Sequence, residues 1–269
     1  MNNQPIPRLR KTAQLQIKEH LKKNTPFVLL PESNWETKRD EFLERLESFP
    51  LTLLRYHKTD PAATRNNATY LKTSYSAIVK NMDAYKKSPD YTYNVASDIR
   101  NLGQDIGKSV FEQFAPDVVS YSVLEEINFW VNFGGDPSGL HYDVYDNFNF
   151  QLSGKKVFYI APPGWKKYHA KKVSTFQGHT SSYGNIRNLR ENASDREVQE
   201  QLNEFSEVEL NCGELLYLPT CWWHEVHAKD SLNTNVNFWW RNESKLLFKF
   251  LPQLYTSLWT YAYRKAKGI

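Results

Sequence analysis

The pattern that most constrains the fold is a series of short strand-like segments that begins near residue 120. Runs of β-branched and aromatic residues, separated by Gly and Pro, span 123–133, 146–154, 155–163, 206–228 and 233–241. This regular succession of short strands and turns is typical of an all-β barrel or sandwich. The aromatic content, 14% of all residues, also suits a β-rich core better than a helical bundle.

The N-terminal part of the chain mixes helices with strands. Apolar residues at helical spacing indicate helices, and short apolar runs indicate strands. The predicted helices are 8–23, 34–49, 76–88 and 106–114, and the predicted strands are 25–30 and 51–57. We therefore predict a mainly β fold with flanking helices and an α/β lead-in.

These patterns divide the chain of 269 residues into three parts. Residues 1–119 form the N-terminal helix and strand region that packs on the barrel, and residues 120–241 form the core. An insertion at about 164–206 interrupts the core strands with a basic segment, a loop-like stretch and a short helix. Residues 242–269 form one or two C-terminal helices, broken near Pro252.

Cysteine content and charge exclude several classes of protein. Cys212 and Cys221 are the only two cysteines, which excludes a disulfide scaffold and a zinc site built from cysteines. The net charge of +4 is too small to indicate nucleic-acid or membrane binding. The N-terminus has no apolar signal region, and no apolar stretch approaches the length of a membrane span. We expect a cytoplasmic protein without membrane association, and the nucleus stays open as a location.

One motif places two metal-binding side chains together. His141 and Asp143 lie two residues apart in a strand-like segment, so both project to the same side. His224 follows 81 residues after Asp143, beside the bulky Trp222 and Trp223. Two histidines and one carboxylate form the facial triad of non-haem Fe(II) oxygenases. A His-x-Asp motif alone more often marks ordinary surface or core residues, but the apolar flanks of His224 favour a dry, restrained site.

Three ordered segments carry a resemblance to a known family. They read PSGLHYDVYDNFNFQLSGKKVFYIAPP, NCGELLYLPTCWWHEV and NVNFWW, and together they cover about residues 120–241. The chain resembles the JmjC and cupin-like family of Fe(II)- and 2-oxoglutarate-dependent oxygenases, and within it the small hydroxylase branch typified by the asparaginyl hydroxylase of hypoxia-inducible factor. The resemblance implies a double-stranded β-helix, the jelly-roll of cupins, with the metal inside.

The resemblance also implies roles for individual residues. It matches the iron ligands to His141, Asp143 and His224, and the partner of the distal carboxylate of 2-oxoglutarate to Lys156. Other matched positions contact the co-substrate or line its pocket, namely Ser138 at the distal carboxylate, Asn147 and Asn237 near the metal-chelating end, and Trp239 as an aromatic wall. The sequence departs from the branch at Asn149, where an aromatic or aliphatic residue is common, so the polarity of the inner pocket stays open.

Two adjacent lysines compete for the anion-binding role. A lysine that points into the barrel at the start of an apolar strand needs an anion, because a buried unpaired ammonium is costly. Lys155 and Lys156 alternate, so only one of them faces inward. Strand parity does not decide which, since a turn separates them from Asp143, and only the resemblance selects Lys156.

The resemblance implies that the protein is a dioxygenase that consumes 2-oxoglutarate and O2 and hydroxylates a C–H bond. A protein or peptide side chain is the preferred substrate. A small-molecule natural product or a tRNA base is the alternative, and lysine demethylation is less favoured because no chromatin-binding module accompanies the core. A cupin that uses another metal and a non-catalytic binding module are the non-oxygenase readings. Neither needs Lys156 beside an intact triad.

Two segments suggest partners. The stretch 164–190 interleaves basic and aromatic residues, a composition that binds nucleic acid or acidic peptides, although a solvated loop explains it equally well. The C-terminal stretch 244–263 is rich in Leu, Trp and Tyr. It predicts a homodimer formed through the C-terminal helices, and a helical cap on the barrel is the alternative.

Overall fold

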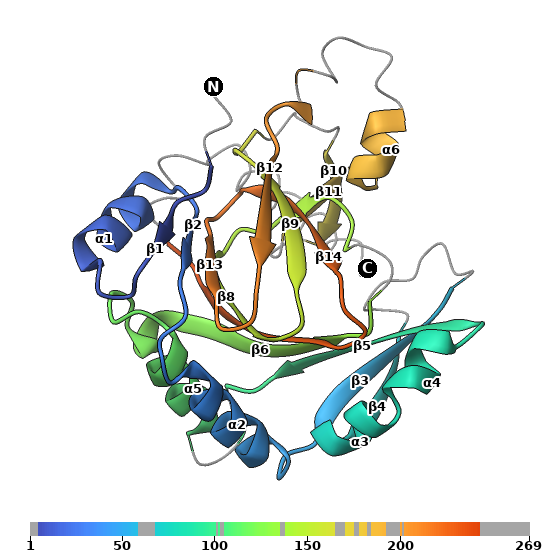
Figure 1. The fold of residues 1–269 in the computed structure, drawn as a ribbon. Coiled ribbons are helices and arrows are strands. Elements are labelled where there is room, and N and C mark those ends of the chain that lie inside the picture. Colours follow the sequence, from blue (N-terminus) through green and yellow to red (C-terminus); the bar gives the residue numbers. More distant parts are fainter. Residues whose placement is uncertain are drawn as a thin grey trace, which may run out of the picture.

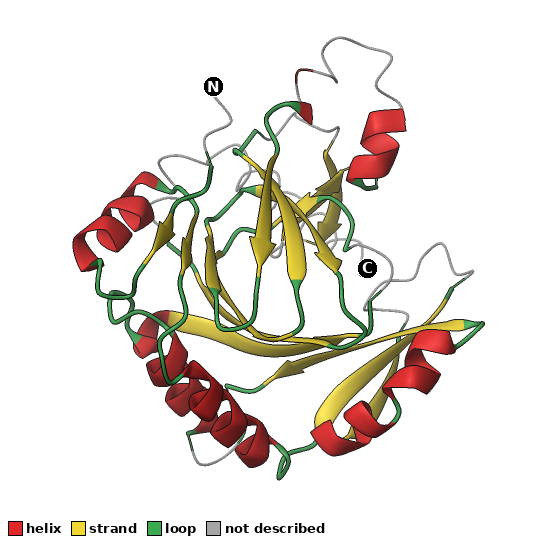
Figure 2. Ribbon diagram, in the orientation of Figure 1, coloured by secondary structure: helices red, strands yellow, loops and turns green. Residues whose placement is uncertain are grey.

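Two facing β-sheets and a layer of helices make up the computed structural model of this chain (Figures 1 and 2). The structure describes residues 5–58, 68–100, 102, 105–134, 138–164, 170–174, 178–181, 184–191, 200 and 202–242. The C-terminal segment predicted to be helical therefore lies outside the described residues.

The large sheet has nine described strands in the order β1-β2-β13-β8-β15-β6-β5-β3-β4. Their bounds are β1 Arg8–Leu9, β2 Phe27–Leu29, β3 Leu51–His57, β4 Thr69–Thr73, β5 Tyr91–Asp98, β6 Leu124–Asn132, β8 Asp146–Ser153, β13 Leu215–Leu218 and β15 Asn233–Trp240. The small sheet runs β10-β11-β7-β14-β9-β12. Its strands are β7 His141–Tyr142, β9 Lys156–Ala161, β10 Ala170–Ser174, β11 Gly178–Ser181, β12 Ser206–Leu210 and β14 Trp223–Ala228.

The chain winds back and forth between the two sheets from β6 onward. Strands β6, β8, β13 and β15 belong to the large sheet, and β7, β9, β12 and β14 face them in the small sheet. Eight strands divided in this way form a jelly-roll, the architecture of cupins. The predicted fold class, a double-stranded β-helix with flanking helices, is confirmed.

Alternation along each strand gives the large sheet two different faces. On β15, Val236 and Phe238 pack into the main hydrophobic cluster, whereas Asn235 and Asn237 face the barrel interior. Helices that contribute apolar side chains to the same cluster cover the outer face of the sheet (Figure 1). They are α1 Gln14–Lys23, α2 Trp35–Leu46, α3 Tyr75–Lys80, α4 Met82–Lys87 and α5 Ile106–Phe114; a 3-10 turn, η2 Tyr121–Val123, precedes β6.

The N-terminal prediction was wrong in two places. The first helix begins at Gln14 rather than at residue 8, because Arg8–Leu9 pairs with β2 and the Arg8 guanidinium binds the Glu214 carboxylate across the sheet. The helix predicted over 76–88 is two short helices. They separate at Asn81, whose side-chain amide donates to the carbonyl oxygen of Ala77 at 2.8 Å.

Several strands were missed or merged. The sequence analysis assigned no strands to β4 and β5, which extend the large sheet beyond β6 and pair with β3. The single run 206–228 contains three strands, and the stretch taken as a loop near residue 180 contains β11, which pairs with β7. Within the described insertion, α6 (Ile186–Glu191) packs Ile186 and Leu189 into the cluster around Trp223. The proposed domain boundaries stay predictions.

In the described part of the chain, no helix is long and apolar enough to cross a bilayer.

A glycine turn sets the start of β9. Gly154 has a φ of +70°, and a Cβ there would lie 2.5 Å from the Leu232 carbonyl oxygen. Gly154→Ala is therefore expected to cost more than about 2 kcal/mol of unfolding free energy, from left-handed strain and a backbone clash. Gly184→Ala is the control, because Gly184 shares the positive φ but a Cβ there would make only an ordinary contact, 3.6 Å from Nδ2 of Asn188. Urea unfolding compares the two variants, and equal losses would contradict the clash.

Candidate metal centre and cavity

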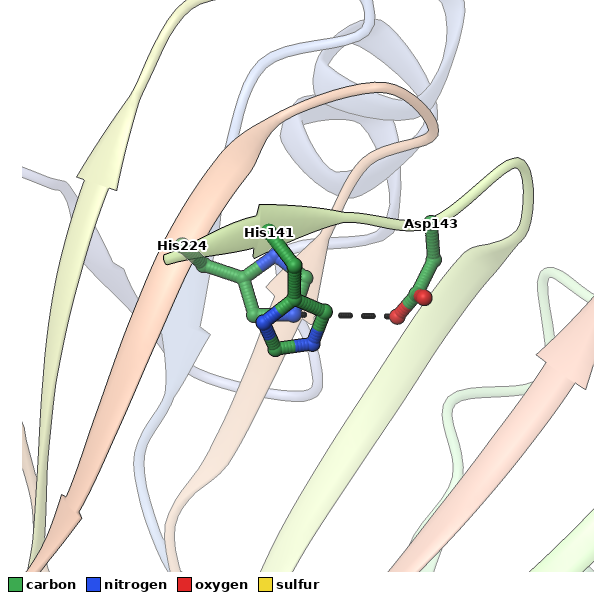
Figure 3. Close-up of side chains that lie close together, drawn as sticks. All are labelled: His141, Asp143 and His224. Atoms are coloured by element: carbon green, nitrogen blue, oxygen red, sulfur yellow. Dashed lines mark ion pairs between the residues drawn. The ribbon is translucent and has the colours of Figure 1, made fainter. Parts of the chain in front are cut away.

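His141, Asp143 and His224 converge on one point inside the barrel (Figure 3). His141 lies on β7, Asp143 follows that strand, and His224 lies on β14 directly opposite His141 in the register. One ligand atom from each of the three side chains lies within 4.8 Å of the other two. The two imidazole ring centres are 4.1 Å apart, and Nε2 of His224 lies 3.6 Å from Oδ2 of Asp143. The structure thus brings the three predicted ligands together, and their binding of a metal stays a prediction.

Backbone carbonyls fix the tautomer of both histidines. Nδ1 of His141 lies 2.8 Å from the Gly139 carbonyl oxygen, and Nδ1 of His224 lies 3.0 Å from that of Trp222. A carbonyl only accepts hydrogen bonds, so each Nδ1 carries the proton and donates it. Each Nε2 therefore keeps its lone pair, which is the state that a metal-binding imidazole needs.

Burial shifts the pKa of His224 and that of Asp143 toward their neutral forms. It lowers the pKa of His224 well below the ordinary histidine value, and the neighbouring His141 lowers it further. Burial also raises the pKa of Asp143, an effect that His141 opposes and the Glu126 carboxylate reinforces. A bound cation would reverse the second effect, because it favours the carboxylate form.

Hydrogen bonds tie together the two chain segments that carry the triad. The Cys221 amide donates to the Asp143 carbonyl oxygen at 2.7 Å. Nearby, the Asp146 carboxylate accepts from the Tyr217 hydroxyl at 2.7 Å and from the Thr220 amide at 3.1 Å. These bonds link the turn before β14 to the start of β8, so they hold His224 in register with His141 and Asp143.

A cavity of about 620 Å³ opens beside the triad. Both sheets line it, the small sheet with Lys156 and Phe158 and the large sheet mainly with amides and aromatic side chains. The large-sheet lining residues on β8, β15 and β6 are Asn147, Asn149, Asn235, Asn237, Trp239, Trp130 and Asn132. The cavity continues along β5 and β3 as far as Asn94 and Tyr56. It is large enough for a small organic acid together with part of a second ligand.

The structure resolves which lysine points inward. Lys156 is 4% exposed and lines the cavity, where its ammonium contacts Oδ1 of Asn235. Lys155 points outward and pairs with Glu209, with 2.9 Å between Nζ and Oε1. Burial lowers the pKa of Lys156 to about 7. No carboxylate of the described residues offsets this cost.

The other predicted co-substrate residues also reach the cavity. Asn147 and Asn237 line it side by side with Trp239, which stacks on Tyr145 at a ring-centre distance of 5.2 Å. Oδ1 of Asn147 is buried and has no hydrogen-bond partner among the described residues. Ser138 lies at the exposed rim, where its hydroxyl accepts from the Val226 amide at 3.1 Å and donates to the Gly139 carbonyl oxygen at 3.3 Å.

Sequence reasoning missed the role of Asn235. Asn235 contacts Lys156, and Asn149 joins it through Asn237, so the inner pocket is more polar than in the aromatic or aliphatic pattern of the resembled branch. The signal was present in the segment NTNVNFWW, whose asparagines recur at every second position. Alternation along the strand predicts that these asparagines share one face, but it does not predict that Lys156 contacts them.

The predicted partner segments are only partly described. Lys166 and Lys167 lie outside the described residues, and Arg187 pairs with Glu191 at 3.0 Å on the surface. The segment 244–263, predicted to form a dimer, lies outside the described residues. Nucleic-acid binding and dimerisation therefore stay predictions.

Comparison with known proteins agrees with this architecture. The family described as the cupin-like domain matches residues 10–246 of this chain. Lysine-specific demethylase JMJ31 of Arabidopsis thaliana is 30% identical over 128 residues, which are 47% of this chain and 23% of the relative. The human bifunctional peptidase and (3S)-lysyl hydroxylase JMJD7 is 27% identical over 188 residues, or 60% of this chain and 57% of that protein. The chain thus spans from about a quarter to just over half of these relatives.

Solved structures show similarity as well. An X-ray structure of ycfD from E. coli aligns with a TM-score of 0.49 and 15% sequence identity, and covers 84% of this chain and 52% of the other.

Proposed function

The chain belongs to the cupin-like domain family, and on that premise we propose that it is a 2-oxoglutarate-dependent non-haem iron dioxygenase that hydroxylates a C–H bond. The observation that carries the proposal is the convergence of His141, Asp143 and His224 beside a cavity that is lined by a buried lysine. A cupin that served only as a binding module would need neither the fixed histidine tautomers nor the buried ammonium.

The donor set suits ferrous iron. Two neutral imidazoles and one carboxylate on one side of an ion leave the other positions open, as in the facial triad of Fe(II) oxygenases. A ferrous ion bound there would supply, together with 2-oxoglutarate and O2, the oxidation of an unactivated C–H bond. His141, Asp143 and His224 would hold the ion, while Trp223, fully buried at the start of β14, would help to exclude water.

The cavity suits 2-oxoglutarate as the co-substrate. Lys156 offers a buried cation that has no carboxylate partner among the described residues, and the distal carboxylate of the co-substrate would supply one. Asn147 and Asn237 would donate or accept hydrogen bonds at the end nearer the triad, with Trp239 as a wall. Ser138 would contribute its hydroxyl from the rim.

A protein or peptide side chain is the substrate that we propose. The relatives reported above are named as a lysyl hydroxylase and a lysine demethylase, and both names refer to protein side chains. The part of the cavity lined by Trp130, Asn132 and Asn94 would take such a side chain beside the co-substrate. Hydroxylation of a natural product or a tRNA base is the alternative that a substrate screen would distinguish.

Co-substrate turnover tests the proposed activity without knowledge of the substrate. Purified protein with Fe(II), 2-oxoglutarate and air is expected to release succinate slowly, and an added substrate should accelerate this release. Succinate formation that requires iron supports a dioxygenase. Absence of iron-dependent succinate, with or without a peptide library, would contradict it.

The pH dependence of co-substrate binding follows from Lys156. Burial lowers its pKa to about 7, so the empty site loses the ammonium as the pH rises above that value. Affinity for 2-oxoglutarate is expected to fall about tenfold for each pH unit above 7, and binding should take up a proton there. Calorimetric titrations at pH 6 to 9, with Mn(II) in place of iron, measure both effects. Lys156→Arg stays charged, so its affinity for 2-oxoglutarate should depend little on pH above 7. An equally steep fall of affinity with pH in that variant would contradict the role of Lys156 in binding the co-substrate.

A further inference from the structure

A directed chain of amides ends at the buried lysine. The Lys156 ammonium donates to Oδ1 of Asn235, and Nδ2 of Asn235 donates to Oδ1 of Asn237 at 2.5 Å. Nδ2 of Asn149 donates to the same Asn237 oxygen at 2.9 Å. Asn235 is 1% exposed, and the other three side chains are also buried, so water does not compete strongly for these bonds.

The network fixes the orientation of the Asn235 amide. The Lys156 ammonium only donates, so Asn235 turns its Oδ1 toward the lysine. Its Nδ2 then faces Asn237, whose Oδ1 accepts from Asn235 and from Asn149. The asparagines of β8 and β15 thus complete the hydrogen bonds of Asn235 and hold its Oδ1 on the side of the lysine.

A neutral acceptor suits a lysine that must bind an anion. An amide oxygen accepts a hydrogen bond from the ammonium but leaves its charge uncompensated. The charge therefore still attracts a carboxylate that enters the cavity. An aspartate at the same position would neutralise the lysine internally, and a leucine would leave the ammonium without an acceptor.

We propose that Asn235 is a positioning residue for Lys156. Its Oδ1 holds the lysine ammonium at the wall of the cavity until the ammonium binds the distal carboxylate of the co-substrate. The inference rests on the proposed function, because it takes 2-oxoglutarate as the dicarboxylate that enters. It assigns to Asn235 a role in co-substrate affinity without direct contact with the reacting atoms.

The test compares Asn235→Asp, Asn235→Leu and the control Asn34→Asp. Asn34 is the exposed residue that precedes α2 and lies outside the cavity lining, so its replacement adds the same negative charge away from Lys156. Calorimetry with 2-oxoglutarate and Mn(II) at pH 7 measures the affinity. We expect a loss of about 100-fold for Asn235→Asp and about tenfold for Asn235→Leu, against less than about threefold for Asn34→Asp. Affinity of Asn235→Asp within threefold of the parent would overturn the proposal.

A second readout separates this inference from the proposed function. NMR titration of the lysine Cε resonances follows Lys156 with no metal or co-substrate present, and assignment comes from Lys156→Met. Asn235→Asp is expected to raise the pKa of Lys156 above about 9, because the new carboxylate stabilises the ammonium. An unchanged titration would refute the coupling of the two residues. If the pKa rises as expected but the parent protein binds no 2-oxoglutarate, the coupling of Asn235 to Lys156 holds, while the proposed function and the co-substrate role given to Asn235 both fail. If Asn235→Asp does not fold, the expected tenfold loss in Asn235→Leu decides the outcome.

Discussion

Asp143→Ala and His224→Ala are each expected to lower iron- and 2-oxoglutarate-dependent succinate formation at least about 100-fold. Loss of a residue that merely supports a metal ligand typically costs 10- to 100-fold, and loss of a ligand itself should cost more. The triad has no described substitute for either side chain, because the described His, Cys, Asp and Glu residues form only this one cluster of metal-binding geometry. Succinate measured after incubation with saturating Fe(II) gives the effect.

A nearby histidine provides the control. His227 lies on the same strand as His224, but its Nε2 bonds to Glu225 at 2.7 Å on the other side of the small sheet. His227→Ala should retain turnover within about threefold of the parent, since a partly exposed residue outside the cavity contributes little there. Similar losses in His227→Ala and His224→Ala would indicate a general folding defect and would contradict the assigned site.

Lys156→Met is expected to remove 2-oxoglutarate binding and at the same time to stabilise the empty protein. The folded chain holds this lysine with a pKa of about 7, far below its value of 10.5 in water. The unfolded chain therefore binds the extra proton between these pH values. Lys156 therefore destabilises the folded state by the full amount below about pH 7, and this destabilisation disappears as the pH approaches 10.5. At pH 6.5 the substitution should raise the unfolding free energy by a few kcal/mol, on the order of the penalty for a buried unpaired charge.

The adjacent lysine is a matched control for this prediction. Lys155 is exposed and forms a surface ion pair with Glu209, which contributes little to stability. Lys155→Met should therefore leave both stability and 2-oxoglutarate affinity nearly unchanged. Thermal unfolding at pH 6.5 and 9.5 distinguishes the two variants: the gain in Lys156→Met should shrink at the higher pH. A loss of stability in Lys156→Met at both pH values would show that burial of the ammonium does not lower the unfolding free energy.

Local periodicity predicted part of the site and could not predict the rest. His141 and Asp143 share a side because strand residues two apart always do. Their partner His224 comes from a strand 81 residues later, so strand spacing does not connect it; its apolar flanks made it a candidate, and the resemblance to known motifs matched it to the triad. The Lys155 and Lys156 ambiguity arose because Gly154, with its positive φ, breaks the parity between β8 and β9. Only the folded chain shows which lysine enters the barrel.

The missed strands have a tertiary cause. The segment that forms β5, YTYNVASD, has no continuous apolar run of the kind taken as a strand in the N-terminal region, although Tyr91, Tyr93 and Val95 alternate with polar residues as in a half-buried strand. It forms because β3 and β6 pair with it on either side, and because Val95 joins the main hydrophobic cluster. β5 also extends the wall of the cavity, so this missed strand belongs to the proposed substrate side.

An anaerobic titration of Fe(II) into the protein, with 2-oxoglutarate present, measures whether His141, Asp143 and His224 bind iron together. We expect one ferrous ion per chain and a weak visible charge-transfer band, both lost in His141→Ala, Asp143→Ala and His224→Ala and retained in His227→Ala. Iron that binds with unchanged stoichiometry and spectrum in all three triad variants would refute the metal site.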